Sequence, residues 1–236
     1  MVSPSDLEQL ISPGRFATFV TLASADRSLA VDLYEWTGAV AGALFTDFRT
    51  LEIVYRNHID RALGSYAASV APHVRHWMWD SSWIPTQGHW WDKDAQEALS
   101  TARKRAGARR SANGVVIAEV TFGFWRYIVS GRYEESFWNT ALDSAFTDIP
   151  GHDPGERRRT LEQSMINLLG LRNRLAHHEP IVKPWTRRLP GGRVGIFTLE
   201  DLYDDLVRVL RWTSPAHAAS LLQTSRVPGL LAARPC

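Results

Sequence analysis

The clearest helical pattern of the chain ends in the stretch Leu168-Leu169-Gly170-Leu171-Arg172-Asn173-Arg174-Leu175-Ala176-His177-His178-Glu179-Pro180. Apolar residues upstream of and within it recur every three or four positions and form one face of a helix. They are Leu161, Met165, Leu168, Leu169, Leu175 and Ala176. Pro180 cannot continue a helix. The pattern therefore predicts a helix over Glu156 to His178 that ends in polar side chains.

The polar residues of this helix end suit the chemistry of RNA cleavage. Asn173 and His177 are four positions apart and therefore neighbours on one helix face. Arg172 lies about 140° round the helix from His177, and its long side chain can swing toward it. An imidazole exchanges protons near pH 7, and a guanidinium neutralises a phosphate. Together they can promote attack of a ribose 2′-OH on the next phosphate, which DNA cannot undergo.

Two questions stay open on spacing alone. Basic residues at a helix C-terminus also interact favourably with the helix dipole, which needs no catalysis. If the site is catalytic, its acid and base come either from two copies of the chain across a two-fold axis or from His177 and His178 of one chain.

The rest of the chain is predicted to be all-α, as a single domain over residues 1–236 with a loose tail from about residue 226. Capping signals and periodicity place the other helices. The first two helices start at Ser5 (with Glu8) and at Ser12-Pro13, and the next three run over 28–69, 94–106 and 115–128. A further helix starts at Thr198 (with Asp201) and runs to Trp212, and the final helix runs from Ser214-Pro215 to about Ser225. Residues 72–94, 148–155 and 185–193 are predicted loops.

Composition fits a globular protein outside membranes. The 236 residues are 44% hydrophobic and 22% charged, and no apolar run approaches the roughly 20 residues of a membrane span. The first ten residues lack the basic start of a signal peptide, and Cys236 is the sole cysteine, so no intrachain disulfide is possible. We expect a cytoplasmic location and no cofactor.

The segment 77–91 holds five of the ten tryptophans. One interpretation is a stacking platform for exposed bases, and the other is a loop attached to the core by its aromatic side chains. His73 and His76 have a spacing compatible with a metal, but the segment offers no cysteine or second histidine pair. We therefore expect no metal site.

A basic cluster follows the predicted helix over 94–106. It comprises Arg103, Lys104, Arg105, Arg109 and Arg110. These cations either stabilise a helix C-terminus or form an edge that contacts RNA phosphates. Five positive charges in eight residues exceed what a helix end needs, and the sequence leaves both interpretations open.

Arg172-Asn173-x-x-x-His177 resembles the Arg-x(4–6)-His motif of the HEPN superfamily, including the polar residue after the arginine. The wider pattern is similar to the Abi-like (abortive infection) branch and spans about residues 3–215. Its segments are 33–36 (LYEW), 48–63, 120–125 (VTFGFW), 132–133, 137–138 and 171–180. Two features depart from the family: Glu179 replaces the tyrosine of one toxin branch, and the Trp-rich stretch 77–91 is an insertion.

The resemblance implies a HEPN-like helical bundle with additional helices, which dimerises through the helices that carry the motif. It implies a metal-independent endoribonuclease of phage defence or a toxin system, with RNA as substrate and an antitoxin or phage-derived trigger as partner. Arg172 and His177 would be catalytic, with Asn173 shaping the pocket. His178, Glu52 and Arg56 would support them, although Glu52 and Arg56 can equally pair on a helix surface. The alternative is a non-catalytic HEPN-fold module that binds RNA or protein.

Overall fold

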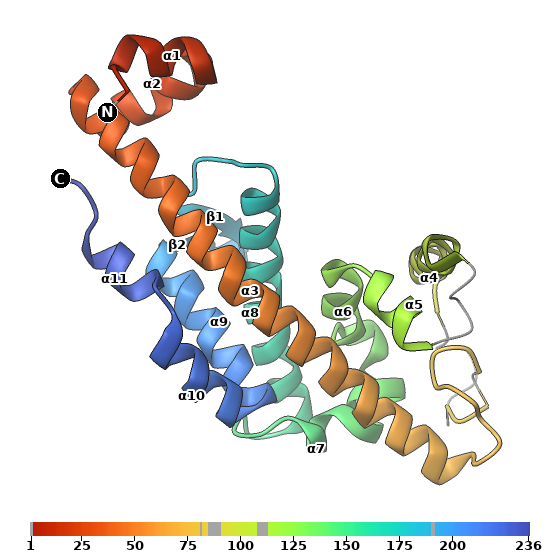
Figure 1. Ribbon diagram of the computed structural model, residues 1–236. Helices are drawn as coiled ribbons and strands as arrows, with labels where there is room; N and C mark the ends of the chain where they lie inside the picture. The colour runs from red at the N-terminus through yellow and green to blue at the C-terminus, as the bar shows by residue number, and fades with distance from the viewer. Residues whose placement is uncertain (1, 81, 85–90, 108–112, 190–191) are drawn as a thin grey trace. The chain divides into compact units, whose positions relative to one another are not determined.

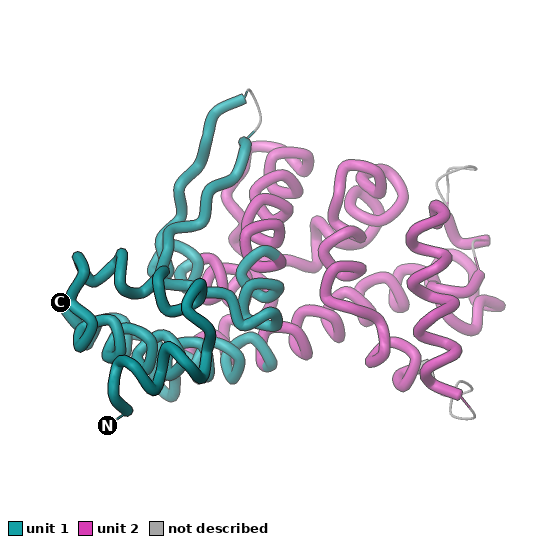
Figure 2. Tube along the Cα trace, turned by 90° about the horizontal axis from the view of Figure 1, so that it is seen from above, with its two compact units in different colours: residues 1–49, 170–204, 220–236 teal, residues 50–169, 205–219 magenta. Residues whose placement is uncertain are grey.

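The computed structural model describes residues 2–80, 82–84, 91–107, 113–189 and 192–236 (Figure 1). Helices dominate these residues, and one two-stranded sheet accompanies them, which confirms the all-α class. The chain divides into two compact units (Figure 2). The first unit holds residues 1–49, 170–204 and 220–236, and the second holds 50–169 and 205–219. The single domain expected from the sequence stays a prediction.

The first unit begins with α1 (Pro4–Ile11) and α2 (Pro13–Leu22). Ser3 caps α1, because its hydroxyl oxygen accepts a hydrogen bond from the Asp6 amide at 3.2 Å. The predicted cap at Ser5 is therefore wrong: a helix tolerates proline at its first position, so α1 starts at Pro4. The start of α2 at Pro13 is confirmed.

The long predicted helix is confirmed as one uninterrupted element, α3 (Arg27–Val70). The Asp26 carboxylate accepts from the amides of Ser28 and Leu29 at 2.9 and 3.0 Å and satisfies donors at its start. A stripe of apolar residues is buried along its length. The stripe comprises Leu33, Trp36, Val40, Leu44, Phe48, Leu51, Tyr55, Ile59 and Leu63. No described helix is long and apolar enough to cross a membrane.

The C-terminal tail is ordered, so the expectation of a loose tail is wrong. It forms α11 (Val227–Ala232) and is attached to α3 within the first unit. The Trp36 indole N–H donates to the Leu230 carbonyl at 2.6 Å, and the Ser225 hydroxyl donates to the Asp47 carboxylate at 2.5 Å. These contacts join residues far apart in sequence, which local patterns do not reveal.

A hairpin replaces the predicted loop over 185–193. Strands β1 (Trp185–Arg188) and β2 (Val194–Phe197) pair antiparallel, with Trp185 opposite Phe197. The Trp185 ring packs against Gly170, where an added Cβ would lie 2.5 Å from a ring carbon. The absence of a side chain at Gly170 therefore leaves space for the Trp185 ring. Strands of four residues are too short to show alternation clearly against the polar residues around them.

In the second unit, the described tryptophans at 77, 83 and 91 pack into the hydrophobic core of that unit. Trp77, Trp83 and Trp91 are buried beside the Phe137 ring. Each indole N–H is paired: Trp77 donates to the Asp60 carboxylate, Trp83 to the Trp77 carbonyl and Trp91 to a further carbonyl. Three of the five tryptophans thus follow the loop interpretation. Trp90 lies outside the described residues.

The helix predicted over 115–128 is broken in two. The segments are α5 (Asn113–Glu119) and α6 (Phe122–Ile128). The break lies at Thr121, whose backbone is extended as the N-cap of α6. Beyond it lie a 3₁₀ turn η2 (Gly131–Tyr133), a π-helix η3 (Glu134–Leu142) and α7 (Asp143–Ala145).

The remaining helices agree with the prediction to within two residues. They are α4 (Lys93–Ala106), α8 (Pro154–Ala176), α9 (Leu199–Thr213) and α10 (Pro215–Thr224). The capping pair at the start of α9 is confirmed: the Thr198 amide donates to the Asp201 carboxylate at 2.8 Å, and the Asp201 amide donates to the Thr198 hydroxyl at 3.2 Å. Buried Asp205 of α9 accepts from Ser164 at 2.8 Å and Asn167 at 2.7 Å of α8.

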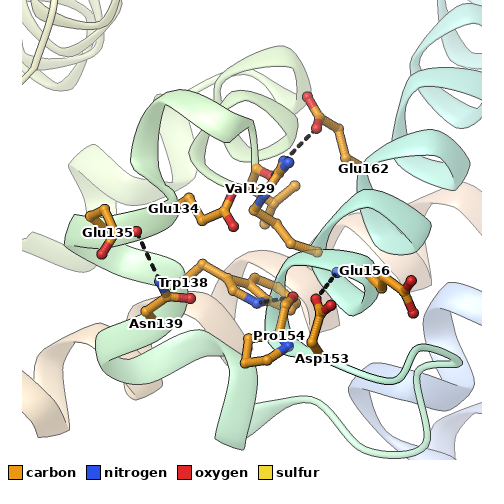
Figure 3. A network of polar contacts seen from close by, with 10 residues as sticks. Val129, Glu134, Glu135, Trp138, Asn139, Asp153, Pro154, Glu156 and Glu162 are labelled. Atoms are coloured by element: carbon orange, nitrogen blue, oxygen red, sulfur yellow. Dashed lines mark hydrogen bonds and ion pairs between the residues drawn. The ribbon is translucent and has the colours of Figure 1, made fainter. Parts of the chain in front are cut away.

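A buried arginine connects the start of α8 to the π-helix, and Figure 3 labels its partners Val129, Glu134 and Glu162. Arg158 is 5% exposed. Its guanidinium donates to Glu134 of η3 at 2.9 Å, to Glu162 at 2.5 Å and to the Val129 carbonyl at 3.1 Å. Next to it, the Trp138 indole N–H donates to the Pro154 carbonyl at 2.8 Å. The guanidinium therefore neutralises two carboxylates that burial would otherwise penalise.

Replacement of Arg158 by methionine should lower the free energy of unfolding by about 2–4 kcal/mol, because two partly buried carboxylates and a carbonyl lose their donor. Arg159→Met is the matched control, because Arg159 follows Arg158 in the chain and its side chain is exposed. It should change the same quantity by less than about 0.5 kcal/mol. Urea unfolding measures both, and equal effects would refute the role of the Arg158 network.

The free energy of unfolding should depend on pH in part through the protonation of His58 of α3. Burial lowers the pKa of its imidazole below the usual 6.5, although a hydrogen bond with the backbone of Ala145 opposes the shift. The unfolded chain then binds a proton more readily than the folded one, so stability falls as pH drops below about 6.5. The fall in unfolding free energy from about pH 7.5 to about pH 5.5 should be smaller in His58→Gln, which does not titrate. An unchanged fall would contradict this prediction.

Candidate active site

The helix end that carries the motif closes in a Schellman turn in the first unit. The His178 amide donates to the Leu175 carbonyl at 3.1 Å, and the Glu179 amide donates to the Arg174 carbonyl at 2.9 Å. His178 has a φ of 52°, in the left-handed region where glycine is usual. The helix therefore ends at Ala176, two residues before the predicted boundary, and a histidine takes the position of the turn glycine.

Arg174 fixes the chain that follows. Its guanidinium donates to the carbonyls of Pro180 at 2.7 Å and Lys183 at 3.2 Å, and it lies 3.6 Å from the Glu179 carboxylate. Burial lowers the pKa of this guanidinium, which Glu179 partly offsets. Sequence reasoning missed this residue, because its partners are mainly backbone carbonyls and no side-chain pattern indicates them.

The three predicted catalytic side chains lie beside this turn. Arg172 is half-buried, and Asn173 and His177 are exposed. The His177 amide donates to the Asn173 carbonyl at 3.0 Å, so these two residues still follow helical spacing. The side chains of all three form no hydrogen bond or ion pair with another described residue. Their donors and acceptors are thus left for water or a ligand.

His178 lines a hollow of about 340 Å³ within the first unit. Arg15 of α2 and Tyr34 and Glu35 of α3 line it as well, together with Glu179. Arg172, Asn173 and His177 are not among its lining residues. The two adjacent histidines therefore have different surroundings: His178 faces the hollow, and His177 belongs to the exposed face of the helix end.

The predicted supporting residues Glu52 and Arg56 belong to the second unit. Within the described part of the chain they form no ion pair with each other. The Arg56 guanidinium instead lies 3.5 Å from the Ala118 carbonyl, and its Nε is buried without a partner among these residues. Their surface pairing is therefore not observed, and a supporting role in catalysis stays a prediction.

The described part of the basic cluster lies on the last turn of α4. Arg103, Lys104 and Arg105 are exposed there. The Arg103 guanidinium stacks over the Trp79 ring, with its central carbon 4.0 Å from the ring centroid. The other two predicted members, Arg109 and Arg110, lie outside the described residues.

The histidines considered for a metal have protein partners. His73 lies 3.0 Å from the Ser82 hydroxyl, and His76 lies 3.4 Å from the Asp60 carboxylate. Among the described residues, no group of three or more His, Cys, Asp and Glu side chains is arranged to hold a metal ion.

Comparison of the chain with protein-family models, curated proteins and solved structures found no match. The resemblance to the Abi-like branch of the HEPN superfamily therefore rests on the motif residues themselves and remains a prediction.

Glycine at position 178 should stabilise the fold. A non-glycine residue in the left-handed region carries a steric cost, so His178→Gly should raise the free energy of unfolding by about 0.5–1 kcal/mol. His177→Gly is the matched control: φ is not positive at the adjacent position, and the substitution there should be neutral or destabilising. Chemical unfolding of both variants measures the difference, and a loss of stability in His178→Gly would contradict the strain at this turn.

Proposed function

We propose that this chain is a metal-independent endoribonuclease of a phage-defence or toxin system, with Arg172 and His177 as catalytic residues and Asn173 shaping the pocket. The observation that supports the proposal is how these side chains and their backbone are bonded. They form no hydrogen bond or ion pair with other described residues, yet their backbone is held by the Schellman turn and by Arg174. These donors and acceptors are therefore accessible to an RNA ligand at a helix end whose backbone is fixed.

In the proposed reaction, the imidazole of His177 takes the proton of a ribose 2′-OH. The 2′-oxygen attacks the neighbouring phosphorus, the bond from phosphorus to the 5′-oxygen breaks, and a second imidazole gives that oxygen a proton. Arg172 balances the charge that grows on the phosphate oxygens. The products are a 2′,3′-cyclic phosphate and a 5′-OH.

The second imidazole belongs either to His178 of the same chain or to His177 of a second copy. His178 lines a hollow to which neither Arg172 nor His177 contributes. This difference favours the second copy and hence a homodimer through the motif-bearing helices, with acid and base on either side of a two-fold axis.

The proposal predicts cleavage of total cellular RNA by the purified protein in the presence of EDTA, with 2′,3′-cyclic phosphate ends. Arg172→Ala and His177→Ala should lower the rate by at least about 100-fold, as expected for loss of a general base or an electrostatic contact in the transition state. The variants should unfold at the same temperature as the parent. Full cleavage by both would contradict the proposal.

Matched controls come from elsewhere in the chain. His152 is exposed in the loop before α8, and Arg211 is exposed in the last turn of α9. Substitution of either by alanine removes the same chemical group without touching the motif and should leave the rate unchanged. RNA binding without products in the parent would instead support the alternative, a HEPN-fold module without catalysis.

A further inference from the structure

We propose that a basic hollow in the second unit binds single-stranded RNA. The hollow has a volume of about 380 Å³. Its lining residues are Met78, Trp79, Trp91, Gln96, Leu99, Ser100, Arg103 and Lys104. In this proposal Arg103 and Lys104 hold a phosphate, and the apolar wall of the hollow receives a base. The proposal concerns binding, so it does not depend on cleavage at Arg172 and His177.

The charge of the hollow selects an anion. Arg103 and Lys104 are the charged residues among its described lining residues, which include no carboxylate. Both side chains are exposed and form no ion pair with another described residue. The hollow beside His178, in contrast, is lined by two glutamates, Glu35 and Glu179, against one arginine, Arg15, and so lacks an excess of positive charge for a polyanion. Of the two hollows, the one on α4 is therefore suited to RNA.

Arg103 is positioned in advance for a phosphate. Its guanidinium lies over the Trp79 ring at 4.0 Å from the centroid, an arrangement that restricts the side chain and leaves the N–H groups at its edge. No hydrogen bond from them to another described residue is formed. A planar guanidinium with unused donors binds a phosphate through two parallel hydrogen bonds. Because stacking already limits its motion, less conformational entropy is lost when the phosphate binds.

The aromatic wall of the hollow distinguishes a nucleotide from a simple phosphate. Trp91 is buried, donates its indole N–H to the Met78 carbonyl at 3.0 Å, and packs against the rings of Phe124 and Phe137. The wall is therefore fixed rather than adaptable. Trp91 is 5% exposed, so a bound base meets the edge of this wall beside the two cations and not the face of the Trp91 ring. Entry into the hollow requires a base whose own faces are open. In a duplex those faces are stacked inside the helix, so the hollow should prefer a single strand.

The position of Arg105 separates this proposal from the helix-dipole interpretation. All three cations of the last turn interact with the dipole of α4, which treats them alike. The hollow distinguishes these cations, because Arg103 and Lys104 line it and Arg105 does not. Arg105 therefore provides a control on the same helix turn, with the same charge.

The test measures binding of a fluorescent 2′-O-methyl RNA strand of about 12 nucleotides to the full chain by anisotropy. This probe has no free 2′-OH, so failure of the ribonuclease proposal would not affect the result. Arg103→Gln and Lys104→Gln should each weaken binding about five- to tenfold, and each should reduce the slope of log affinity against log salt by about 0.7. Arg105→Gln and Lys93→Gln should weaken it less than about twofold. Thermal unfolding of each variant confirms that the fold is intact.

Three outcomes would overturn the proposal. The first is an equal loss of affinity in Arg103→Gln and Arg105→Gln, which indicates diffuse attraction to α4. The second is equal affinity for a duplex of the same sequence. The third is no binding by the parent at low salt, where electrostatic attraction is strongest.

Discussion

The buried stripe of α3 is the constraint on which the rest of the structure depends. Burying each of its large apolar side chains contributes about 1.5–3 kcal/mol, so a break in the helix would cost several such contributions at once. The stripe continues through residues of both units, with Trp36 and Leu44 in the first and Tyr55 and Leu63 in the second. The helix runs without interruption over 44 residues despite glycines at 38 and 42.

Polar groups on the same helix define what packs against it. In the first unit, the Trp36 indole attaches α11 through the Leu230 carbonyl. In the second, the Asp60 carboxylate accepts from Trp77 and faces His76. Burial would raise the pKa of Asp60, but the hydrogen bonds from His76 and Trp77 outweigh it and lower the pKa. The tail and the Trp-rich segment are thus attached to α3 by directional contacts from polar groups beside its apolar stripe.

The sequence predicts those elements whose information is local. Apolar periodicity identifies α3 and most of α8, Ser-Pro pairs identify the starts of α2 and α10, and a capping pair identifies the start of α9. It does not predict α11, the hairpin or the π-helix, because each depends on partners distant in sequence or on strands too short to show a period. The Gly170 contact with Trp185, for example, becomes visible only once the hairpin lies against α8.

At the candidate site, too, local sequence predicts some features and leaves others unpredicted. Spacing places Arg172, Asn173 and His177 at a helix end, and the structure agrees on that location. It adds the left-handed His178, the bonds of Arg174 to backbone carbonyls and the stacking of Arg103 on Trp79. His178 thus occupies a backbone position in which glycine would be less strained. A stability role alone would favour glycine there.

In the proposed reaction, the ribose 2′-OH is the nucleophile at a site formed by Arg172 and His177. The most direct measurement uses a short RNA that the protein cuts and a copy with one 2′-deoxy nucleotide on the 5′ side of the cut bond. The account predicts that cleavage at that bond is lost in the copy, while the parent RNA is cut there to a 2′,3′-cyclic phosphate. Cleavage of the deoxy-substituted bond at an undiminished rate would contradict it.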